Sequence, residues 1–154
     1  MKELLKKLLF VFVFIGLSLE ANTMYLLTKI DKAYLVVENY SSKLSKDIKY
    51  DVMEELQNSA DELNIDTSGY SYRTLAFIIF DSYLDDNLVI NVELVLGEEI
   101  QRLDDKEEVY ALTYRKSKQF IANKKDADEI EEELFDSVDT LLGSFKDQYI
   151  EDNE

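Results

Sequence analysis

The chain of 154 residues contains no histidine, cysteine, proline or tryptophan, and it contains only four glycines. Without histidine, it lacks the usual general base near neutral pH and the Ser–His and Cys–His nucleophile pairs. Without cysteine as well, it lacks the usual ligands of zinc, haem and iron–sulfur centres. No disulfide can form, so the fold depends on packing alone. We therefore expect no cofactor, no metal site and no catalytic residues of these kinds.

The charge of the chain is one-sided. It has 33 acidic residues against 17 basic ones, and a net charge of −16 at pH 7. A chain this acidic is repelled by nucleic acid and by anionic membrane surfaces, so cations, basic proteins and neutral surfaces are the expected partners. Hydrophobic residues make up 46% of the sequence and follow ordered patterns. The chain is therefore expected to fold, and not to be a disordered acidic tail.

Residues 1–21 have the pattern of a secretory signal peptide that is cleaved after Ala21. Three lysines lie in the first seven residues, and the uncharged apolar run 8–19 follows them. As a helix this run of twelve residues is about 18 Å long, whereas a bilayer core is about 30 Å thick. A positive start, a short apolar run and a small residue at its end are typical of signal peptides. An uncleaved anchor is the main alternative, and the absence of cysteine closes the lipoprotein route.

Residues 22–154 are expected to form a single domain. The chain has no proline, and its glycines are far apart, so it has neither a flexible linker nor a glycine-rich phosphate loop. The hydrophobic pattern predicts six elements in the order strand, helix, three strands, helix. They span residues 29–40, 41–63, 74–83, 88–96, 109–120 and 126–150. This order predicts an α+β two-layer sandwich, β-α-β-β-β-α, with a four-stranded, mostly antiparallel sheet and two long helices on one face.

Polar residues give the expected helix ends. Ser41 or Ser42 can accept a backbone N–H at the start of the first helix. Asp126, with Glu129 three residues later, has the pattern of a capping box at the start of the second helix. Residues 151–154 are expected to be a frayed tail.

Alternation gives the expected strand faces. In residues 88–96 the even-numbered positions are all Leu, Ile or Val, so this side is predicted to face the core. In the strand at 109–120, the same reasoning places Tyr110, Leu112 and Tyr114 together on one face. The polar stretch 97–108 is predicted to be a long connection between these two strands.

The many carboxylates raise two further hypotheses. A glycosidase-like pair needs two carboxyl groups across a cleft, and the candidates are Asp81, Asp85, Glu93 and Glu108. The sequence places no two of them together, so solvated strand ends and turns are the favoured interpretation. For calcium, the stretch that begins at Asp81 has Asp86 where an EF-hand loop needs glycine and Val92 where it needs glutamate, and that motif is rejected. Loose Ca²⁺ binding by residues 103–108 stays open beside an ordinary charged loop.

A candidate interface lies in the strand at 109–120. The chain has ten tyrosines, and tyrosine is favoured at interfaces because it combines a large area with a polar tip. The candidate residues are Tyr110, Tyr114, Arg115, Lys116 and Lys118. The basic residues could contact an acidic region of a second copy, or they could protect an edge strand from pairing. The tyrosines could equally line the solvated face or the edge of the core.

The order of the elements resembles that of a group of small envelope domains. The stretches that carry it are VMEELQNSADELNI in the first helix and LLGSFKDQYIED in the last. The group includes the amino-terminal domain of TolB, the auxiliary lipoproteins of lipid-transporting ABC systems, and the lipopolysaccharide-assembly lipoprotein LptE. The chain is also similar to small acidic periplasmic proteins of bacteria. It departs from the lipoproteins because it has no cysteine to acylate. The resemblance implies binding of other envelope proteins or lipids, without catalysis.

These observations predict a non-catalytic, exported accessory protein of the bacterial cell envelope that acts in the periplasm through protein–protein interaction. The expected partner is an envelope protein or a second copy, with no nucleic acid and no stable membrane anchor. The alternative is a periplasmic protein that binds a small molecule or Ca²⁺ on the sheet face that the helices leave open. A carboxylate-dependent hydrolase is the third possibility.

Overall fold

In a computed structural model of the chain, the described residues are 27–123 and 125–154. They form four strands and two helices: β1 (Tyr34–Asn39), α2 (Ile48–Glu62), β2 (Arg73–Leu84), β3 (Asn87–Gln101), β4 (Glu108–Ile121) and α3 (Ala127–Asn153). The predicted order β-α-β-β-β-α and the α+β class are confirmed. The predicted signal peptide, residues 1–21, lies outside the described residues.

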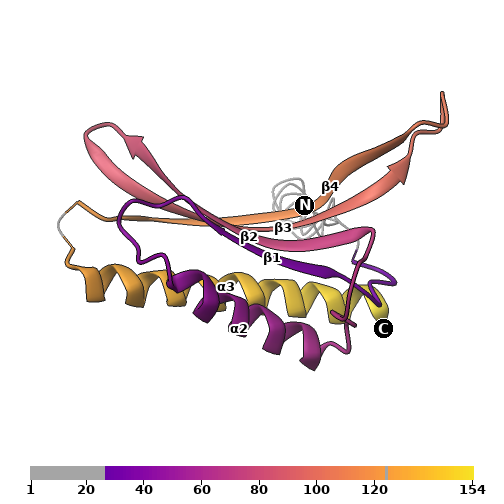
Figure 1. The fold of residues 1–154 in the computed structure, drawn as a ribbon, viewed down its shortest axis with the longest axis horizontal. Coiled ribbons are helices and arrows are strands. Elements are labelled where there is room, and N and C mark those ends of the chain that lie inside the picture. The colour runs from indigo at the N-terminus through magenta and orange to yellow at the C-terminus, as the bar shows by residue number, and fades with distance from the viewer. Residues whose placement is uncertain (1–26, 124) are drawn as a thin grey trace, which may run out of the picture.

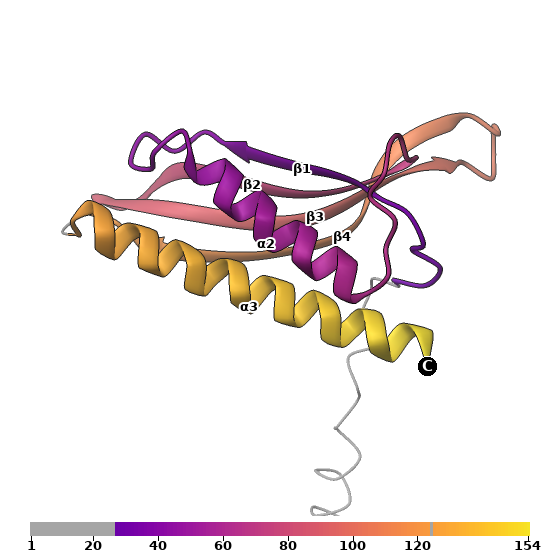
Figure 2. The ribbon, with the colours of Figure 1, turned by 60° about the horizontal axis from the view of Figure 1, so that its bottom comes forward.

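The strands form one sheet in the order β1-β2-β3-β4. β1 is parallel to β2, because helix α2 carries the chain back before β2 begins, and the other two pairs are antiparallel. Asp85, with φ 54°, and Asp86 make the two-residue turn between β2 and β3. Both helices lie on the same face of the sheet (Figures 1 and 2), with α2 against β1 and α3 against β3 and β4. The far end of the β3–β4 hairpin bends away from the helices (Figure 1).

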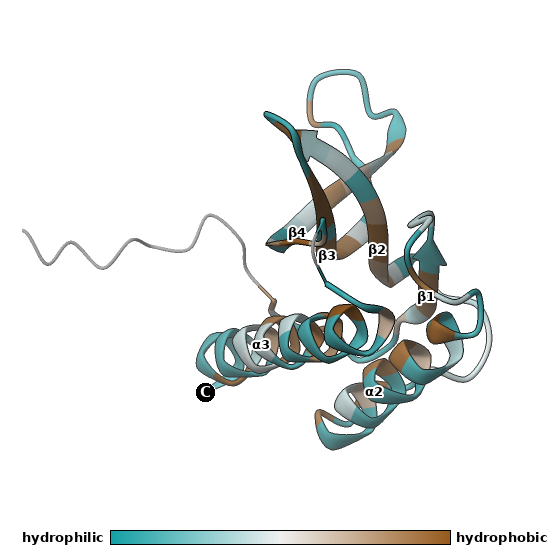
Figure 3. Cartoon of the chain, turned by 90° about the vertical axis from the view of Figure 1, so that its left-hand side faces the viewer, coloured by the Kyte–Doolittle hydropathy of each residue, from teal (hydrophilic) through white to brown (hydrophobic). Residues whose placement is uncertain are grey.

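The core lies between the sheet and the helices. The even-numbered residues of β3 from Leu88 to Leu96 are all buried, as the alternation predicts. Phe145 of α3 packs its ring edge-to-face on that of Tyr114, with the ring centroids 5.3 Å apart. The buried positions of α3 are Ile130, Leu134, Ser137, Val138, Leu141, Leu142, Phe145 and Gln148. Figure 3 views the two layers end on, with apolar residues on the strands and hydrophilic ones over much of α3.

The predicted start of the first helix is wrong. α2 begins at Ile48, and its N-cap residue Asp47 makes no side-chain cap hydrogen bond. Ser42 instead donates from its backbone N–H and its hydroxyl to Asp81 Oδ2, at 2.8 and 2.7 Å. Asn39 Nδ2 donates to the carbonyl oxygen of Ser45. These bonds hold residues 40–47 as a loop over the end of β2, because polar side chains compete with the helix for local backbone groups.

The end of the second helix also differs from the prediction, whereas its start does not. The capping box is confirmed: Glu129 N–H donates to Asp126 Oδ1, and Asp126 N–H donates to Glu129 Oε2. The predicted frayed tail is helical as far as Asn153. Asp152 Oδ2 accepts the N–H of Leu27 at 2.6 Å, and Asn153 Nδ2 donates to the carbonyl oxygen of Leu27 at 2.9 Å. These contacts anchor the last turn against the segment that precedes β1.

Half of the connection predicted at residues 97–108 is strand. β3 continues to Gln101 and β4 begins at Glu108, which leaves residues 102–107 as the loop. The guanidinium of Arg102 binds the carboxylates of Asp105 and Glu107 and so closes this loop. The first strand is shorter than predicted. Lys32 lies before it, and its backbone forms only an isolated β-bridge with that of Asp66.

No helix in the two described ranges combines the length and the apolarity needed to cross a membrane.

Candidate functional site

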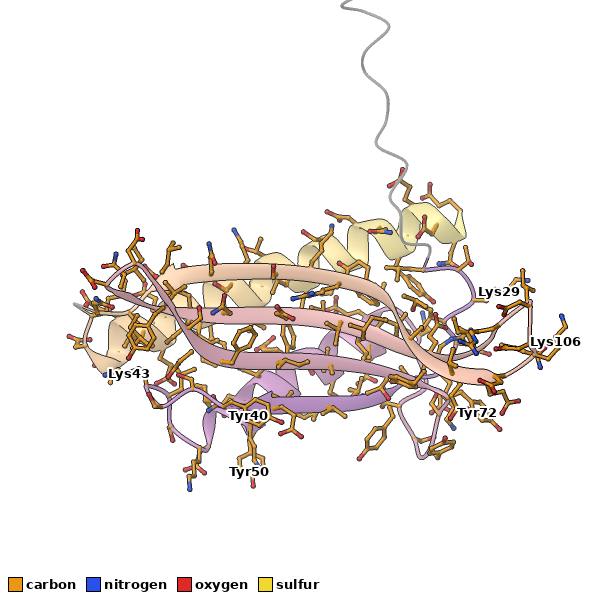
Figure 4. The ribbon with its side chains drawn as sticks, turned by 90° about the horizontal axis from the view of Figure 1, so that it is seen from above. Lys29, Tyr40, Lys43, Tyr50, Tyr72 and Lys106 are labelled. Atoms are coloured by element: carbon orange, nitrogen blue, oxygen red, sulfur yellow. The ribbon has the colours of Figure 1, made fainter. Side chains whose placement is uncertain are left out.

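The face of the sheet opposite the helices, called the helix-free face below, is turned toward the viewer in Figure 4. Successive residues of a strand point to opposite faces of the sheet, so a residue whose sequence neighbours face the helices lies on the helix-free face. In one row across the strands Val36 pairs with Ala76, and Ala76 pairs with Val95. In the next row Tyr34 pairs with Thr74, Thr74 with Gly97, and Gly97 with Leu112. The centre of the helix-free face is therefore mainly apolar.

The side chains around this centre remain open to solvent. Ala76 and Val95 are buried by their neighbours, although no helix covers them. Tyr34 and Leu112 are each more than half exposed. Exposed apolar side chains grouped around buried apolar ones make a continuous patch, in contrast to single exposed residues scattered over a surface.

A β-bulge in β4 decides which tyrosines belong to this face. Leu96 pairs with Tyr114 but Gly97 pairs with Leu112, so Thr113 is an extra residue in β4. One extra residue reverses the alternation of the strand. Tyr114 therefore points toward the helices and is fully buried, whereas Tyr110 lies on the helix-free face and is 57% exposed. The prediction that Tyr110, Leu112 and Tyr114 share one face is wrong, and burial raises the pKa of Tyr114 to about 12.

Gly97 fixes the position of the Tyr110 ring. A Cβ atom added to Gly97 would lie 2.6 Å from Tyr110 Cζ, which is closer than carbon atoms approach. The ring thus occupies the space where any other residue would place its side chain. A glycine within a strand often marks a close approach of this kind.

Four tyrosines line a groove of about 550 Å³ at the hairpin end of the helix-free face. We call it the tyrosine groove, and its lining residues are Tyr34, Gly69, Tyr70, Ser71, Tyr72, Thr74, Glu99 and Tyr110. The rings of Tyr70 and Tyr72 meet edge-to-face, with centroids 5.7 Å apart. All four tyrosines are more than half exposed. Figure 4 labels Tyr72, close to the hairpin that carries Lys106.

A second hollow, of about 740 Å³, adjoins the tyrosine groove. We call it the acidic cleft. It shares Tyr70, Ser71, Tyr72 and Glu99 with the groove, and adds Asp31, Lys32, Arg73, Glu98, Ile100, Gln101 and Glu108. Arg73 Nε lies 2.5 Å from Glu98 Oε1, and Arg73 Nη1 lies 3.3 Å from Asp31 Oδ1. Lys32 Nζ lies 3.0 Å from Asp66 Oδ2. Both cations of the cleft are therefore already paired with carboxylates.

The five predicted interface residues do not form one surface. Tyr110 and Arg115 lie on the helix-free face, whereas Tyr114 is in the core and is not accessible to a second protein. Lys116 and Lys118 pair with the core-facing Leu94 and Val92, so they lie on the opposite side of β4 from Arg115. The sheet order makes β4 an edge strand, where lysine opposes pairing with another strand.

The charge of Arg115 is compensated within the sheet. Its Nε and Nη2 atoms donate to the two carboxylate oxygens of Glu93, at 3.1 and 2.6 Å. This two-point pairing fixes both side chains. Arg115 therefore does not offer a free positive charge to an acidic partner.

The four candidate acids for hydrolysis do not converge. Asp85 is in the turn between β2 and β3, whereas Glu108 begins β4 at the opposite end of the sheet, and Glu93 is paired with Arg115. Burial alone would raise the pKa of Asp81, but hydrogen bonds from Ser41 and Ser42 outweigh it and hold that pKa below its ordinary value. A general acid needs the opposite shift.

The acidic loop considered for calcium binding already contains a positive charge, the guanidinium of Arg102. Asp105 and Glu107 both bind Arg102. The pKa of Asp105 is lowered mainly by the hydrogen bond that it accepts from the N–H of Glu107, and to a smaller extent by its bond with Arg102. Within residues 27–123 and 125–154, no group of three or more acidic side chains is placed to hold a metal ion.

Sequence reasoning missed Gly97, Leu112 and Tyr34 as parts of one surface. The available signal was Gly97, a single glycine next to an alternating strand, which can indicate a bulge or a close contact. Nothing in the sequence indicated that Tyr34, Tyr72 and Tyr110 lie together, because they come from β1, from the loop before β2 and from β4.

Comparison with known proteins gives little further information. No family model matches the chain, and no curated protein matches it. Among solved structures the chain is similar to a PelC dodecamer from Paraburkholderia phytofirmans, with 10% sequence identity and a TM-score of 0.33. The match covers 71% of this chain and 82% of that chain. A likeness at this level carries no argument about function, and the resemblance to TolB, LptE and the ABC-system lipoproteins stays a prediction.

Proposed function

We propose that this chain is a non-catalytic accessory protein, exported to the bacterial cell envelope, that binds another protein through the helix-free face. The observation that carries the proposal is the apolar and aromatic surface around Tyr34, Leu112 and Tyr110, each more than half exposed. Continuous exposed apolar patches are typical of interaction sites. Tyrosine is enriched at such sites because it contributes a large contact area at low entropic cost.

The distribution of charge supports the same face. Helix α3 alone carries ten acidic residues and one lysine. On the helix-free face, Glu93 is neutralised by Arg115 at the centre of the patch. A protein partner therefore has fewer charges to desolvate, and gains most apolar contact, on the side of the sheet that the helices leave open.

Export is supported by the sequence of residues 1–21, with its lysines, its short apolar run and Ala21. A chain without thiols has no disulfide to form or lose in an oxidising compartment. The calcium and hydrolase alternatives receive less support, because Arg102 occupies the acidic loop and the candidate carboxylates are spread over both ends of the sheet.

The test is crosslinking in the cells that produce the full chain, with one lysine substitution on each side of the molecule. Leu112→Lys places a charge on the helix-free face, and Ile150→Lys places the same charge on the exposed side of α3. Leu112 is 57% exposed and Ile150 50%, so neither change buries a charge. Sedimentation of the purified chain shows separately whether the partner is a second copy.

We expect the unaltered chain and Ile150→Lys to form a crosslinked product of the same defined mass, and Leu112→Lys to lose it. Equal products from all three chains, or no product of defined mass from any of them, would contradict the proposed function. Circular dichroism of each purified variant confirms that it is folded.

A further inference from the structure

We infer that the tyrosine groove and the acidic cleft together bind an extended basic segment of the partner protein, containing arginine or lysine. This inference rests on the proposed function and adds the chemistry of the partner at one end of the helix-free face. It draws on three features: two continuous hollows, aromatic walls held in place, and carboxylates without a cationic partner.

The two hollows form one continuous binding surface. They share Tyr70, Ser71, Tyr72 and Glu99, and together they reach from Tyr34 on β1 to Glu108 on β4. Neighbouring strands are about 4.8 Å apart, so crossing four strands requires at least about 14 Å, the length of about four residues of extended chain. A single small cation would fill only part of this length.

The aromatic walls are fixed before binding. The Tyr110 ring lies over Gly97, where no side chain competes for its place. Tyr70 and Tyr72 hold each other edge-to-face at an interplanar angle of 79°. Because these rings are already placed, they lose little freedom when a ligand stacks on them.

The charge of the surface selects a cation. Arg73 is paired with Glu98 and Asp31, and Lys32 is paired with Asp66. Within the described residues, neither Glu99 nor Glu108 forms a salt bridge, and both side chains are exposed. An anionic segment would meet these carboxylates, and both cations that line the cleft are already paired.

Glu99 is placed to act with an aromatic ring. It lies directly opposite Tyr110 across the β3–β4 pair, on the same face of the sheet. A guanidinium can stack on a tyrosine ring and donate to an adjacent carboxylate at the same time. The pair thus offers one arginine both of the contacts that it prefers. A second copy of the chain is a poor occupant, because two molecules of net charge −16 repel each other.

The test is fluorescence anisotropy with the full chain and a labelled seven-residue peptide that alternates glycine and arginine, at roughly physiological salt, where surface charges are screened beyond about 8 Å. Two variants alter the site, Tyr72→Ser and Glu99→Gln. Two matched variants make the same changes on α2, Tyr50→Ser and Glu54→Gln. Tyr72 and Tyr50 are both about two thirds exposed (67% and 64%), and neither is in the core.

We expect Tyr72→Ser and Glu99→Gln each to weaken binding about fivefold or more, as loss of a cation–π or charge-assisted contact should. The two α2 variants should stay within about twofold of the unaltered chain, as expected for surface charges distant from the site. Thermal melts by circular dichroism confirm that all four variants are folded.

The inference is overturned if all four variants bind the peptide equally well, because net charge alone then attracts it. It is also overturned if a peptide with glutamate in place of arginine binds as tightly as the arginine peptide. A third contradicting result is that cellohexaose, a neutral saccharide, binds through Tyr72 while the arginine peptide does not bind. If the peptide fails while Leu112→Lys still abolishes the crosslinked product, the basic segment is wrong and the proposed function stands. If the peptide binds at Tyr72 and Glu99 but no crosslinked product depends on Leu112, the proposed function fails and the basic preference of the groove stands alone.

Discussion

Replacing Gly97 with alanine should destabilise the protein only while Tyr110 is present. The added methyl group would overlap the Tyr110 ring, which must then leave its place on the helix-free face. The backbone at Gly97 has no positive φ that would itself oppose alanine. The expected cost therefore comes from the displaced ring, and it should disappear when the ring is removed.

The size of the effect follows from the burial of Tyr110. The residue is 57% exposed, so roughly two fifths of its surface is covered. With ~200 Å² for a fully buried tyrosine and ~25 cal/mol per Å², displacing the ring costs at most about 2 kcal/mol. Against this, alanine is favoured over glycine within a strand by about 0.5–1 kcal/mol. We expect Gly97→Ala to lower the free energy of unfolding by about 1 kcal/mol, and to raise it by about 0.5–1 kcal/mol in a Tyr110→Ala background.

The assay is urea unfolding of the four chains of this double-mutant cycle, followed by far-UV circular dichroism at 25 °C. The slope of the free energy against urea should be the same in all four, so that differences in midpoint report stability. If Gly97→Ala shifts stability by the same amount and with the same sign in both backgrounds, the ring does not lie over Gly97 and the reasoning is refuted.

Three further predictions concern the core and the pH dependence of stability. Phe145→Ala should lower the free energy of unfolding by about 3–5 kcal/mol in urea titrations, because the ring is buried against Tyr114. Burial raises the pKa of Tyr114 to about 12, above the ordinary value of about 10, so the folded state holds its proton more tightly. The free energy of unfolding should therefore fall between about pH 10 and pH 12. Urea midpoints measured across this range should decline less for Tyr114→Phe than for the unaltered chain. Hydrogen bonds from Ser68, followed by Lys32, lower the pKa of Asp66 to about 2. The contribution of ionised Asp66 to the free energy of unfolding should be complete above about pH 4 and lost as the pH falls through about 2. The urea midpoint of Asp66→Asn should therefore change less over that interval than the midpoint of the unaltered chain.

The fold was predictable because the apolar pattern is strong where elements cover each other. The even-numbered positions from Leu88 to Leu96 face a buried layer, and that prediction is confirmed. The failures occurred where a distant partner decides the local structure. Ser42 binds Asp81, 39 positions away, and so does not cap a helix. The last turn of α3 is helical because Leu27 contacts it.

The candidate site was less predictable than the fold. A bulge is set by how two strands pair, and Thr113 has no sequence feature that identifies it as the extra residue. That single residue moves Tyr114 into the core and leaves Tyr110 on the helix-free face. The strands on either side of residues 97–108 extend into that stretch because the two arms of the hairpin pair with each other, which no apolar pattern in the arms indicates.

The most direct test of binding through the helix-free face is oxidative footprinting of tyrosines in the full chain. It compares the purified protein with the envelope fraction of the cells that produce it. Tyr34 and Tyr110 lie on the helix-free face and Tyr50 lies on α2, and all three are more than half exposed in the isolated fold. We predict that Tyr34 and Tyr110 lose reactivity in the envelope fraction while Tyr50 keeps it. Unchanged reactivity at Tyr34 and Tyr110, or an equal loss at Tyr50, would contradict the account.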